Sequence, residues 1–227
     1  MRYLGGKALI ARRLSAIINA ERGAAPVWEP FCGGAWMTRA LGHNVHASDV
    51  NADVIRLYER VRRDGVSWLP DNPTRDEVLA GRVPGSDGFA FFNIACAFGG
   101  KPGAGPAVGI NGDSALTYAQ LAKRHLLEIA ACPARFGCCS FFDATPRAGL
   151  FLYCDPPYRG TTGYSIPFDN DAFERRVLEW ARAGSVVYVS EFAFPHGEIV
   201  FERTGGKRFG AGATRGTKTE RMYRVAS

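Results

Sequence analysis

The stretch Leu150-Phe151-Leu152-Tyr153-Cys154-Asp155-Pro156-Pro157-Tyr158 decides how this chain of 227 residues folds. Its first five residues form a short apolar run bounded by turn formers, which predicts an interior strand of a parallel sheet. Asp155 follows at the carboxyl end of that strand, the edge where open α/β sheets bind ligands. Residues 155–158 are therefore a candidate binding loop, although a proline-rich turn that merely closes a strand has the same composition.

The chemistry of this tetrapeptide indicates what it binds. Pro156 and Pro157 lack N–H groups and have a fixed φ, so their carbonyls remain unpaired acceptors on a stiff loop. Tyr158 adds a flat aromatic face for stacking. A carboxylate, a carbonyl and a ring together suit the binding of a planar ring that carries an exocyclic amino group.

The composition is typical of a soluble globular enzyme, with 46% hydrophobic and 22% charged residues. The length suffices for one domain with a smaller inserted lobe. No apolar run reaches membrane-spanning length and the first residues lack a secretory stretch, so we expect a cytoplasmic protein. The six cysteines and four histidines form no metal-binding or disulfide pattern.

Positive charge gathers near the two ends of the chain, whose net charge is +6. The carboxyl-terminal stretch is the richer of the two and contains Arg203, Lys207, Arg208, Arg215, Lys218, Arg221 and Arg224. Two basic ends fit phosphate contacts on a nucleic acid. A solvated surface explains the same charges equally well.

The order of predicted elements indicates an α/β fold with a doubly wound sheet. We expect residues 1–64 and 148–227 to form a catalytic domain, and residues 65–147 to form an inserted target-recognition lobe. In the domain, strands at 27–29, 45–48, 150–154 and 185–190 alternate with helices at 7–20, 35–41, 52–63 and 172–183. The lobe is rich in Pro, Gly and Asp, with helical segments at 89–97 and 117–131.

Two further features lie at the same expected sheet edge. Glu29-Pro30-Phe31-Cys32-Gly33-Gly34-Ala35 is a strand-to-helix turn whose glycines allow close backbone approach to a ligand. It is not G-x-G-x-x-G, so the dinucleotide fingerprint is absent. Asp49 ends the next strand, where nucleoside-binding proteins place a carboxylate for ribose hydroxyls. It is equally well placed to cap the following helix.

These segments, in this order, resemble the DNA N6-adenine methyltransferases, and most closely the short phage-encoded members. The resemblance is carried by Arg2-Tyr3-Leu4-Gly5-Gly6-Lys7, residues 29–34, Ser48-Asp49-Val50-Asn51, Phe98-Gly99-Gly100-Lys101, residues 155–158 and Lys218-Thr219-Glu220-Arg221. It implies a Rossmann-like, S-adenosylmethionine-dependent methyltransferase fold with a small, mainly helical inserted recognition lobe.

The resemblance also implies an activity, which is site-specific methyl transfer from S-adenosylmethionine to N6 of a flipped adenine in DNA, without a metal. The DNA is expected to be double-stranded and the enzyme a monomer. Catalysis falls to Asp155, Pro156, Pro157 and Tyr158. Cofactor binding falls to Tyr3, Lys7, Glu29, Pro30, Phe31, Gly33, Gly34, Asp49 and Asp155, and DNA binding to Lys101, Arg215, Lys218 and Arg221.

Asp155 has a chemical role in such a reaction. Adenine N6 is a poor nucleophile because its lone pair is delocalised into the ring. If Asp155 and the Pro156 carbonyl accept its hydrogens, the nitrogen can attack the methyl group in line, and the carboxylate offsets the developing positive charge. The alternatives are cytosine N4 or an amide nitrogen as acceptor, or a catalytically silent DNA-binding relative.

Overall fold

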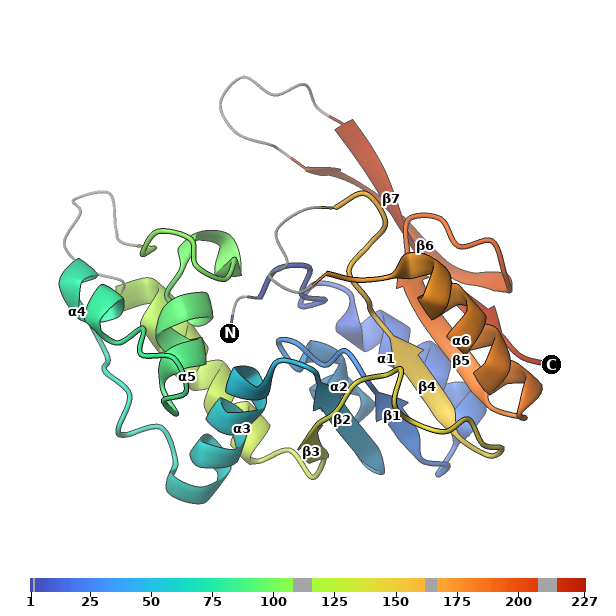
Figure 1. Cartoon of the computed structure of the whole chain (residues 1–227), viewed down its shortest axis with the longest axis horizontal. Helices are drawn as coiled ribbons and strands as arrows, with labels where there is room; N and C mark the ends of the chain where they lie inside the picture. The colour runs from blue at the N-terminus through green and yellow to red at the C-terminus, as the bar shows by residue number, and fades with distance from the viewer. Residues whose placement is uncertain (2, 108–115, 162–166, 208–215) are drawn as a thin grey trace.

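The computed structural model describes residues 1, 3–107, 116–161, 167–207 and 216–227. In these ranges the strands form one seven-stranded sheet with the order β3-β2-β1-β4-β5-β7-β6 (Figure 1). β3, β2, β1, β4 and β5 are parallel, and β7 and β6 complete the sheet as an antiparallel hairpin. The strands are β1 (Val27–Glu29), β2 (Val45–Asp49), β3 (Arg135–Cys138), β4 (Phe151–Cys154), β5 (Val186–Glu191), β6 (Glu198–Lys207) and β7 (Gly216–Val225).

Helices cover both faces of this sheet, as the doubly wound prediction requires. They are α1 (Ala11–Arg22), α2 (Trp36–Leu41), α3 (Ala52–Asp64), α4 (Arg75–Ala80), the short η1 (Phe91–Ala95) and η2 (Phe98–Gly100), α5 (Leu116–Ala130) and α6 (Asn170–Arg182). No helix in the described ranges is long and apolar enough to cross a membrane.

Successive side chains along a strand point to opposite faces of the sheet. In β4, Tyr153 packs in the core with α1, α2 and α3, while Leu152 packs on the opposite face with Trp180 of α6. In β5, Tyr188 packs on the same face as Tyr153, and Val187 packs on the same face as Leu152. Because both faces are covered, β4 and the first four residues of β5 are apolar, and this explains why continuous apolar runs predict these two strands.

The order of the strands places a topological switch point between β1 and β4. From β1 the chain proceeds outward through β2 to β3, and then returns to β4 and β5 on the other side of β1. Ligands of open α/β sheets bind beyond the carboxyl ends of the strands at such a point. The two segments that meet there are the glycine turn after Glu29 and the loop that begins at Asp155.

The predicted helix at 7–20 is wrong at its start, because α1 begins at Ala11. Lys7 instead lies in a turn, where its carbonyl accepts hydrogen bonds from the N–H groups of Ile10 and Ala11. Two glycines before it, Gly5 and Gly6, favour this non-helical path. The consequence is functional, since the turn directs the Lys7 side chain inward.

The predicted lobe contributes to the sheet as well as lying beside it. Its α4, η1, η2 and α5 lie to one side of the strands (Figure 1). β3 comes from the same range and pairs with β2, with Phe136 opposite Ala47. Neither β3 nor α4 is among the elements predicted from the sequence, because β3 has no apolar run and only Val78 of α4 is buried. The target-recognition role of residues 65–147 stays a prediction.

The substitution Leu152→Ala tests the sheet core. Leu152 is 0% exposed between two parallel strands, so truncation is expected to lower the free energy of unfolding by about 2–5 kcal/mol. Leu9→Ala is the matched control, since Leu9 is 84% exposed and its loss should cost less than about 0.5 kcal/mol. Urea unfolding followed by circular dichroism measures both, and equal effects would contradict this packing.

Candidate active site

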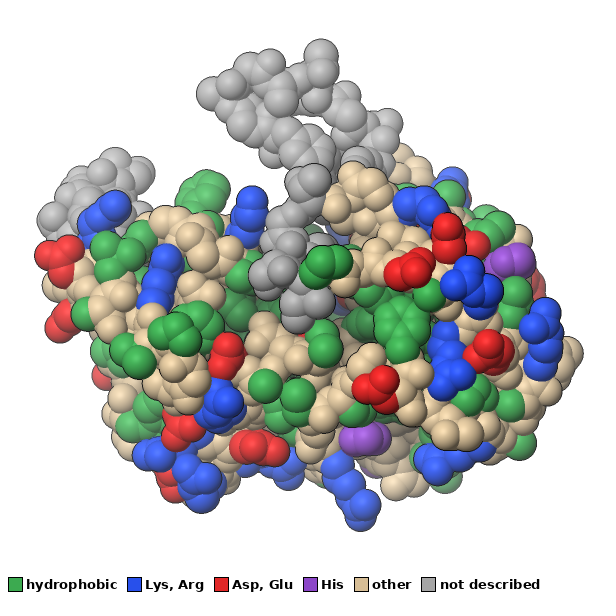
Figure 2. Space-filling model, in the orientation of Figure 1, with side chains coloured by type: hydrophobic (Ala, Val, Ile, Leu, Met, Phe, Trp, Pro, Cys, Tyr) green, Lys and Arg blue, Asp and Glu red, His purple; other side chains and the backbone are tan. Residues whose placement is uncertain are grey.

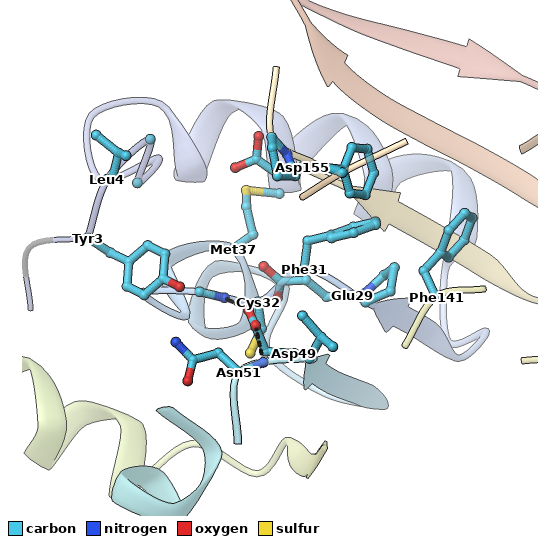
Figure 3. A pocket seen from close by; sticks show the side chains of 18 of the residues that line it. Tyr3, Leu4, Glu29, Phe31, Cys32, Met37, Asp49, Asn51, Phe141 and Asp155 are labelled. Carbon is cyan, nitrogen blue, oxygen red and sulfur yellow. Dashed lines mark hydrogen bonds between the residues drawn. The ribbon is translucent and has the colours of Figure 1, made fainter. Parts of the chain in front are cut away.

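A cavity of ≈ 220 Å³ lies at the switch point. Tyr3, Phe31, Asp49 and Asp155 surround it in Figure 3. Its walls come from the segment before α1 and from the carboxyl ends of four parallel strands, with lining residues at 3–7, 29–34, 36–37, 49–51, 102, 139–142, 155, 157 and 167–168. The glycine turn and the carboxylate of Asp155 therefore share one cavity.

Asp49 holds the glycine turn in place. Its Oδ2 accepts a hydrogen bond from the Gly33 N–H at 2.9 Å, and its Oδ1 accepts one from the Asn51 N–H at 2.9 Å. The cap of α3 is Asn51, whose side chain accepts from the Asp53 N–H, so Asp49 is not that cap. Burial raises the pKa of Asp49 and the backbone hydrogen bonds oppose this rise.

The glycines of the turn leave room for Tyr3. A Cβ on Gly33 would lie 3.0 Å from Cε1 of Tyr3, and a Cβ on Gly34 would lie 3.0 Å from its Cβ. Gly33 also has a φ of +42°, which a side chain rarely tolerates. The Tyr58 hydroxyl donates a hydrogen bond to the Gly33 carbonyl at 2.5 Å. Only glycine at both positions lets the aromatic ring close against the turn.

His125 of α5 supports the same turn from the side of the lobe. Its ring centroid lies 3.9 Å from that of Trp36, and its Nε2 lies 2.7 Å from the Gly34 carbonyl oxygen. Burial lowers the pKa of His125 to about 3, so the ring is neutral near neutral pH. Nε2 then carries the hydrogen that the carbonyl accepts, and Nδ1 accepts from Arg39 at 2.8 Å.

Glu29 places a second acid in the wall of the cavity. It is buried, and its Oε2 accepts a hydrogen bond from the Thr38 hydroxyl at 2.5 Å. Burial raises the pKa of Glu29 well above its ordinary value, and the negative charges of Asp155 and Asp49 add to the rise. A cationic group placed beside this carboxyl would oppose that rise and favour its ionised form.

Lys7 and Asp155 form the central ion pair of the site. Nζ of Lys7 donates to Oδ1 of Asp155 at 2.6 Å and to the Gly5 carbonyl at 3.0 Å. The Lys7 side chain is 5% exposed and that of Asp155 is 16% exposed. Burial raises the pKa of Asp155, while the Lys7 ammonium acts in the opposite direction. Lys7 thus favours the ionised carboxylate in an otherwise unfavourable environment.

The remainder of the tetrapeptide lies next to this pair. Pro157 lines the cavity and Pro156 is buried behind it. The ring of Tyr158 lies beside the cavity, with Nζ of Lys7 4.9 Å from its centroid and Phe192 edge-on at 4.7 Å. The structure therefore brings Lys7, Asp155 and Tyr158 into direct contact, although they are far apart in the sequence.

An aromatic wall completes the cavity, and Phe141 and Phe142 in it are not among the residues predicted from the sequence. Phe31 lies 5.5 Å from Phe141 and 5.7 Å from Phe168, measured between ring centroids. Ser140 and Phe142 line the cavity beside them. Residues 139–142 follow β3, so the failure to predict that strand also concealed this loop. Phe31 was the one aromatic residue of the wall that the turn motif indicated.

The structure describes the side chains of only two of the four predicted DNA-binding residues, Lys101 and Arg221. Lys101 is exposed at the end of η2, close to Phe98, which is 71% exposed. Arg221 forms an ion pair with Glu202 at 2.6 Å and donates to the Phe192 carbonyl at 2.6 Å. Lys218 pairs through its backbone with Gly205, and Arg215 lies outside the described residues.

Charge on the visible surface is mixed. On the face shown in Figure 2, described Lys and Arg side chains alternate with Asp and Glu. Within the described ranges, no group of three or more His, Cys, Asp or Glu side chains is arranged to hold a metal ion.

Comparison with known proteins gives a family match for part of the chain. Residues 3–93 match the D12 class N6 adenine-specific DNA methyltransferases, which confirms over these residues the predicted resemblance to the DNA N6-adenine methyltransferases. The closer resemblance to short phage-encoded members stays a prediction. No curated protein matches the chain.

Solved structures resemble the chain at low sequence identity and low TM-score, and two of them serve as examples. The rRNA methyltransferase aviRa from Streptomyces viridochromogenes is 19% identical with a TM-score of 0.40, covering 98% of this chain and 87% of that one. An S-adenosylmethionine-dependent methyltransferase from Clostridium acetobutylicum is 10% identical with a TM-score of 0.36, covering 97% and 75%.

The substitution Gly34→Ala tests the glycine turn. The added Cβ would lie 3.0 Å from Cβ of Tyr3 and 3.1 Å from Cδ1 of Trp36, so the ring of Tyr3 must move. Affinity for S-adenosylhomocysteine, measured by titration calorimetry, is expected to fall about tenfold. Gly105→Ala is the control, because nothing lies within 4 Å of its added Cβ. Unchanged affinity in Gly34→Ala would show that the turn does not contact the cofactor.

Proposed function

We propose that this chain, whose residues 3–93 match the D12 class, transfers a methyl group from S-adenosylmethionine to N6 of adenine in DNA. The observation that carries the proposal is the shared cavity, in which the carboxylate of Asp155 faces the same space as the glycine turn after Glu29. A methyl donor held by the turn and an amine held by Asp155 would meet there. The enzyme supplies position and charge for this reaction.

The residues of the cavity suit S-adenosylmethionine, which supplies an electrophilic methyl group on a sulfonium. The aromatic wall of Phe31, Phe141 and Phe168 offers an apolar surface for an adenine ring. Asp49 lies at the end of β2, where it is suited to ribose hydroxyls. Glu29 is the natural partner for an ammonium group, because an added cation would offset the charge that burial makes unfavourable. Tyr3 and the glycines then close the cavity over the bound molecule.

Asp155 is proposed to activate the target amine. Lys7 favours the ionised carboxylate and holds its Oδ1 through a hydrogen bond, while the group lines the cavity. An N6–H donated to this carboxylate allows the nitrogen to pyramidalise and to present its lone pair in line with the methyl group. The same negative charge stabilises the nitrogen as it becomes cationic, while the methyl–sulfur bond breaks and neutral S-adenosylhomocysteine leaves. The nitrogen then loses its surplus proton, which the carboxylate of Asp155 is placed to accept.

The target base must leave the helix to reach Asp155. Its N6 is inaccessible inside a duplex, and extrusion costs a few kcal/mol. Tyr158 provides a stacking surface beside the carboxylate, which offsets part of this cost. We propose double-stranded DNA as the substrate of a cytoplasmic monomer, with Lys101, Arg215, Lys218 and Arg221 contacting phosphates and residues 65–147 selecting the target.

Product analysis tests the proposal directly. The protein is incubated with methyl-labelled S-adenosylmethionine and duplex DNA, and the DNA is then digested to nucleosides. Label in N6-methyl-2′-deoxyadenosine is the expected result. Label in N4-methyl-2′-deoxycytidine would identify cytosine as the acceptor instead, and absence of label from DNA would overturn the proposal.

The substitution Asp155→Ala is expected to lower the single-turnover rate at least about 10²-fold, because both the acceptor and the offsetting charge are lost. DNA affinity should change much less, and circular dichroism confirms that the variant is folded. Glu59→Ala is the control, because Glu59 is an exposed acid of α3 outside residues 65–147, and it should retain the wild-type rate. Full turnover in Asp155→Ala would remove Asp155 from the mechanism.

The rate is also expected to depend on pH through Asp155. Burial raises its pKa, so the carboxylate becomes protonated at a higher pH than an exposed aspartate, whose pKa is about 3.9. The rate is therefore full above the raised pKa and falls as the pH drops through it. Single-turnover rates across mildly acidic pH, with circular dichroism to confirm folding, measure this limb. A limb at the position of an exposed aspartate would contradict the account.

A further inference from the structure

A second carboxylate contacts the central ion pair. Oε1 of Glu220 lies 3.2 Å from Nζ of Lys7, and the same oxygen accepts a hydrogen bond from the Tyr158 hydroxyl at 3.2 Å. Glu220 belongs to β7, and its side chain is 29% exposed. The Lys7 ammonium is therefore shared between Asp155 of the tetrapeptide and Glu220 of the carboxyl-terminal hairpin.

The charge balance of this cluster matters for methyl transfer. Lys7 and Asp155 alone form a neutral pair, and the ammonium 2.6 Å from the carboxylate would oppose positive charge on a nitrogen bound to Asp155. With Glu220 included, two carboxylates surround one ammonium and the cluster carries one net negative charge. A cationic transition state is stabilised by the second arrangement and not by the first.

We propose that Glu220 is a positioning residue that holds Lys7 and the Tyr158 hydroxyl and gives the site its net negative charge. The inference rests on the proposed function. When the target amine binds to Asp155, Glu220 retains the ammonium of Lys7, so that the carboxylate of Asp155 is free to accept from the amine. Glu220 does not touch the reacting atoms and acts through Lys7 and Tyr158.

Glu220 is distinguished from the other groups that face Asp155. These groups are Lys7 before α1, Glu29 on β1, Tyr153 and Cys154 on β4, Tyr158, Glu191 on β5 and Glu220 on β7. Glu191 accepts from the backbone N–H groups of Arg159 and Phe192, and Glu29 accepts from Thr38. Among these acids, Glu220 is the one besides Asp155 that forms an ion pair with Lys7.

The substitution Glu220→Gln tests this role, because it removes the charge and keeps an acceptor of the same shape. The single-turnover rate with S-adenosylmethionine and duplex DNA is expected to fall about tenfold or more. Affinity for S-adenosylhomocysteine and for DNA should stay within about twofold of wild type. Glu220→Asp, which retains the charge, should recover part of the lost rate.

The pH profile provides a readout that a purely structural role would not move. The negative charge of Glu220 contributes to raising the pKa of Asp155, so its removal should shift the acid limb of the rate to lower pH. Glu198→Gln is the matched control. It removes the same charge from an exposed position on β6 of the same hairpin and should leave the rate and the limb unchanged.

The outcomes separate this inference from the proposed function. If the wild-type protein methylates adenine and Glu220→Gln matches it in rate and pH profile, the role of Glu220 is refuted and the function stands. If both Glu220 variants lose S-adenosylhomocysteine binding, Glu220 is structural and the inference is equally refuted. If the wild-type protein itself transfers no methyl group to DNA, the proposed function fails.

Discussion

The site depends on a buried ion pair between two residues that are far apart in the chain. Removing Lys7 and Asp155 from water is costly, and neither charge is tolerated without the other. The pair therefore ties the segment before α1 to the loop after β4. Since the same segment carries Tyr3, which packs on the glycine turn, one electrostatic contact also fixes the entrance to the cavity.

The parallel sheet makes this contact possible. β1 and β4 lie side by side, and the chain leaves them in opposite directions, so their carboxyl ends are not covered by a crossing connection. The turn after Glu29 and the loop from Asp155 consequently face one space. The hairpin of β6 and β7 then adds Glu220, so that two other segments of the chain meet at the ammonium of Lys7.

Much of this arrangement could be predicted from the sequence, because the buried parallel strands are largely apolar and end in recognisable turns. The strands before Glu29-Pro30, before Asp155 and around Val187 were predictable for that reason. β3 was not, since it is an edge strand with residues such as Arg135 exposed, and the cavity wall at Phe141 was missed with it. The contact of Glu220 with Lys7 could not be predicted either, because strand pairing in the hairpin sets the position of Glu220 and local sequence does not determine it.

The central claim is that the carboxylate of Asp155 binds the amine that receives the methyl group. The most direct measurement is a structure of the protein with S-adenosylhomocysteine and a duplex that contains the methylated sequence. We expect an extruded adenine stacked on Tyr158, with its N6 about 2.6–3.2 Å from an oxygen of Asp155. An adenine that remains in the helix, or an N6 bound elsewhere while Asp155 contacts only protein, would contradict it.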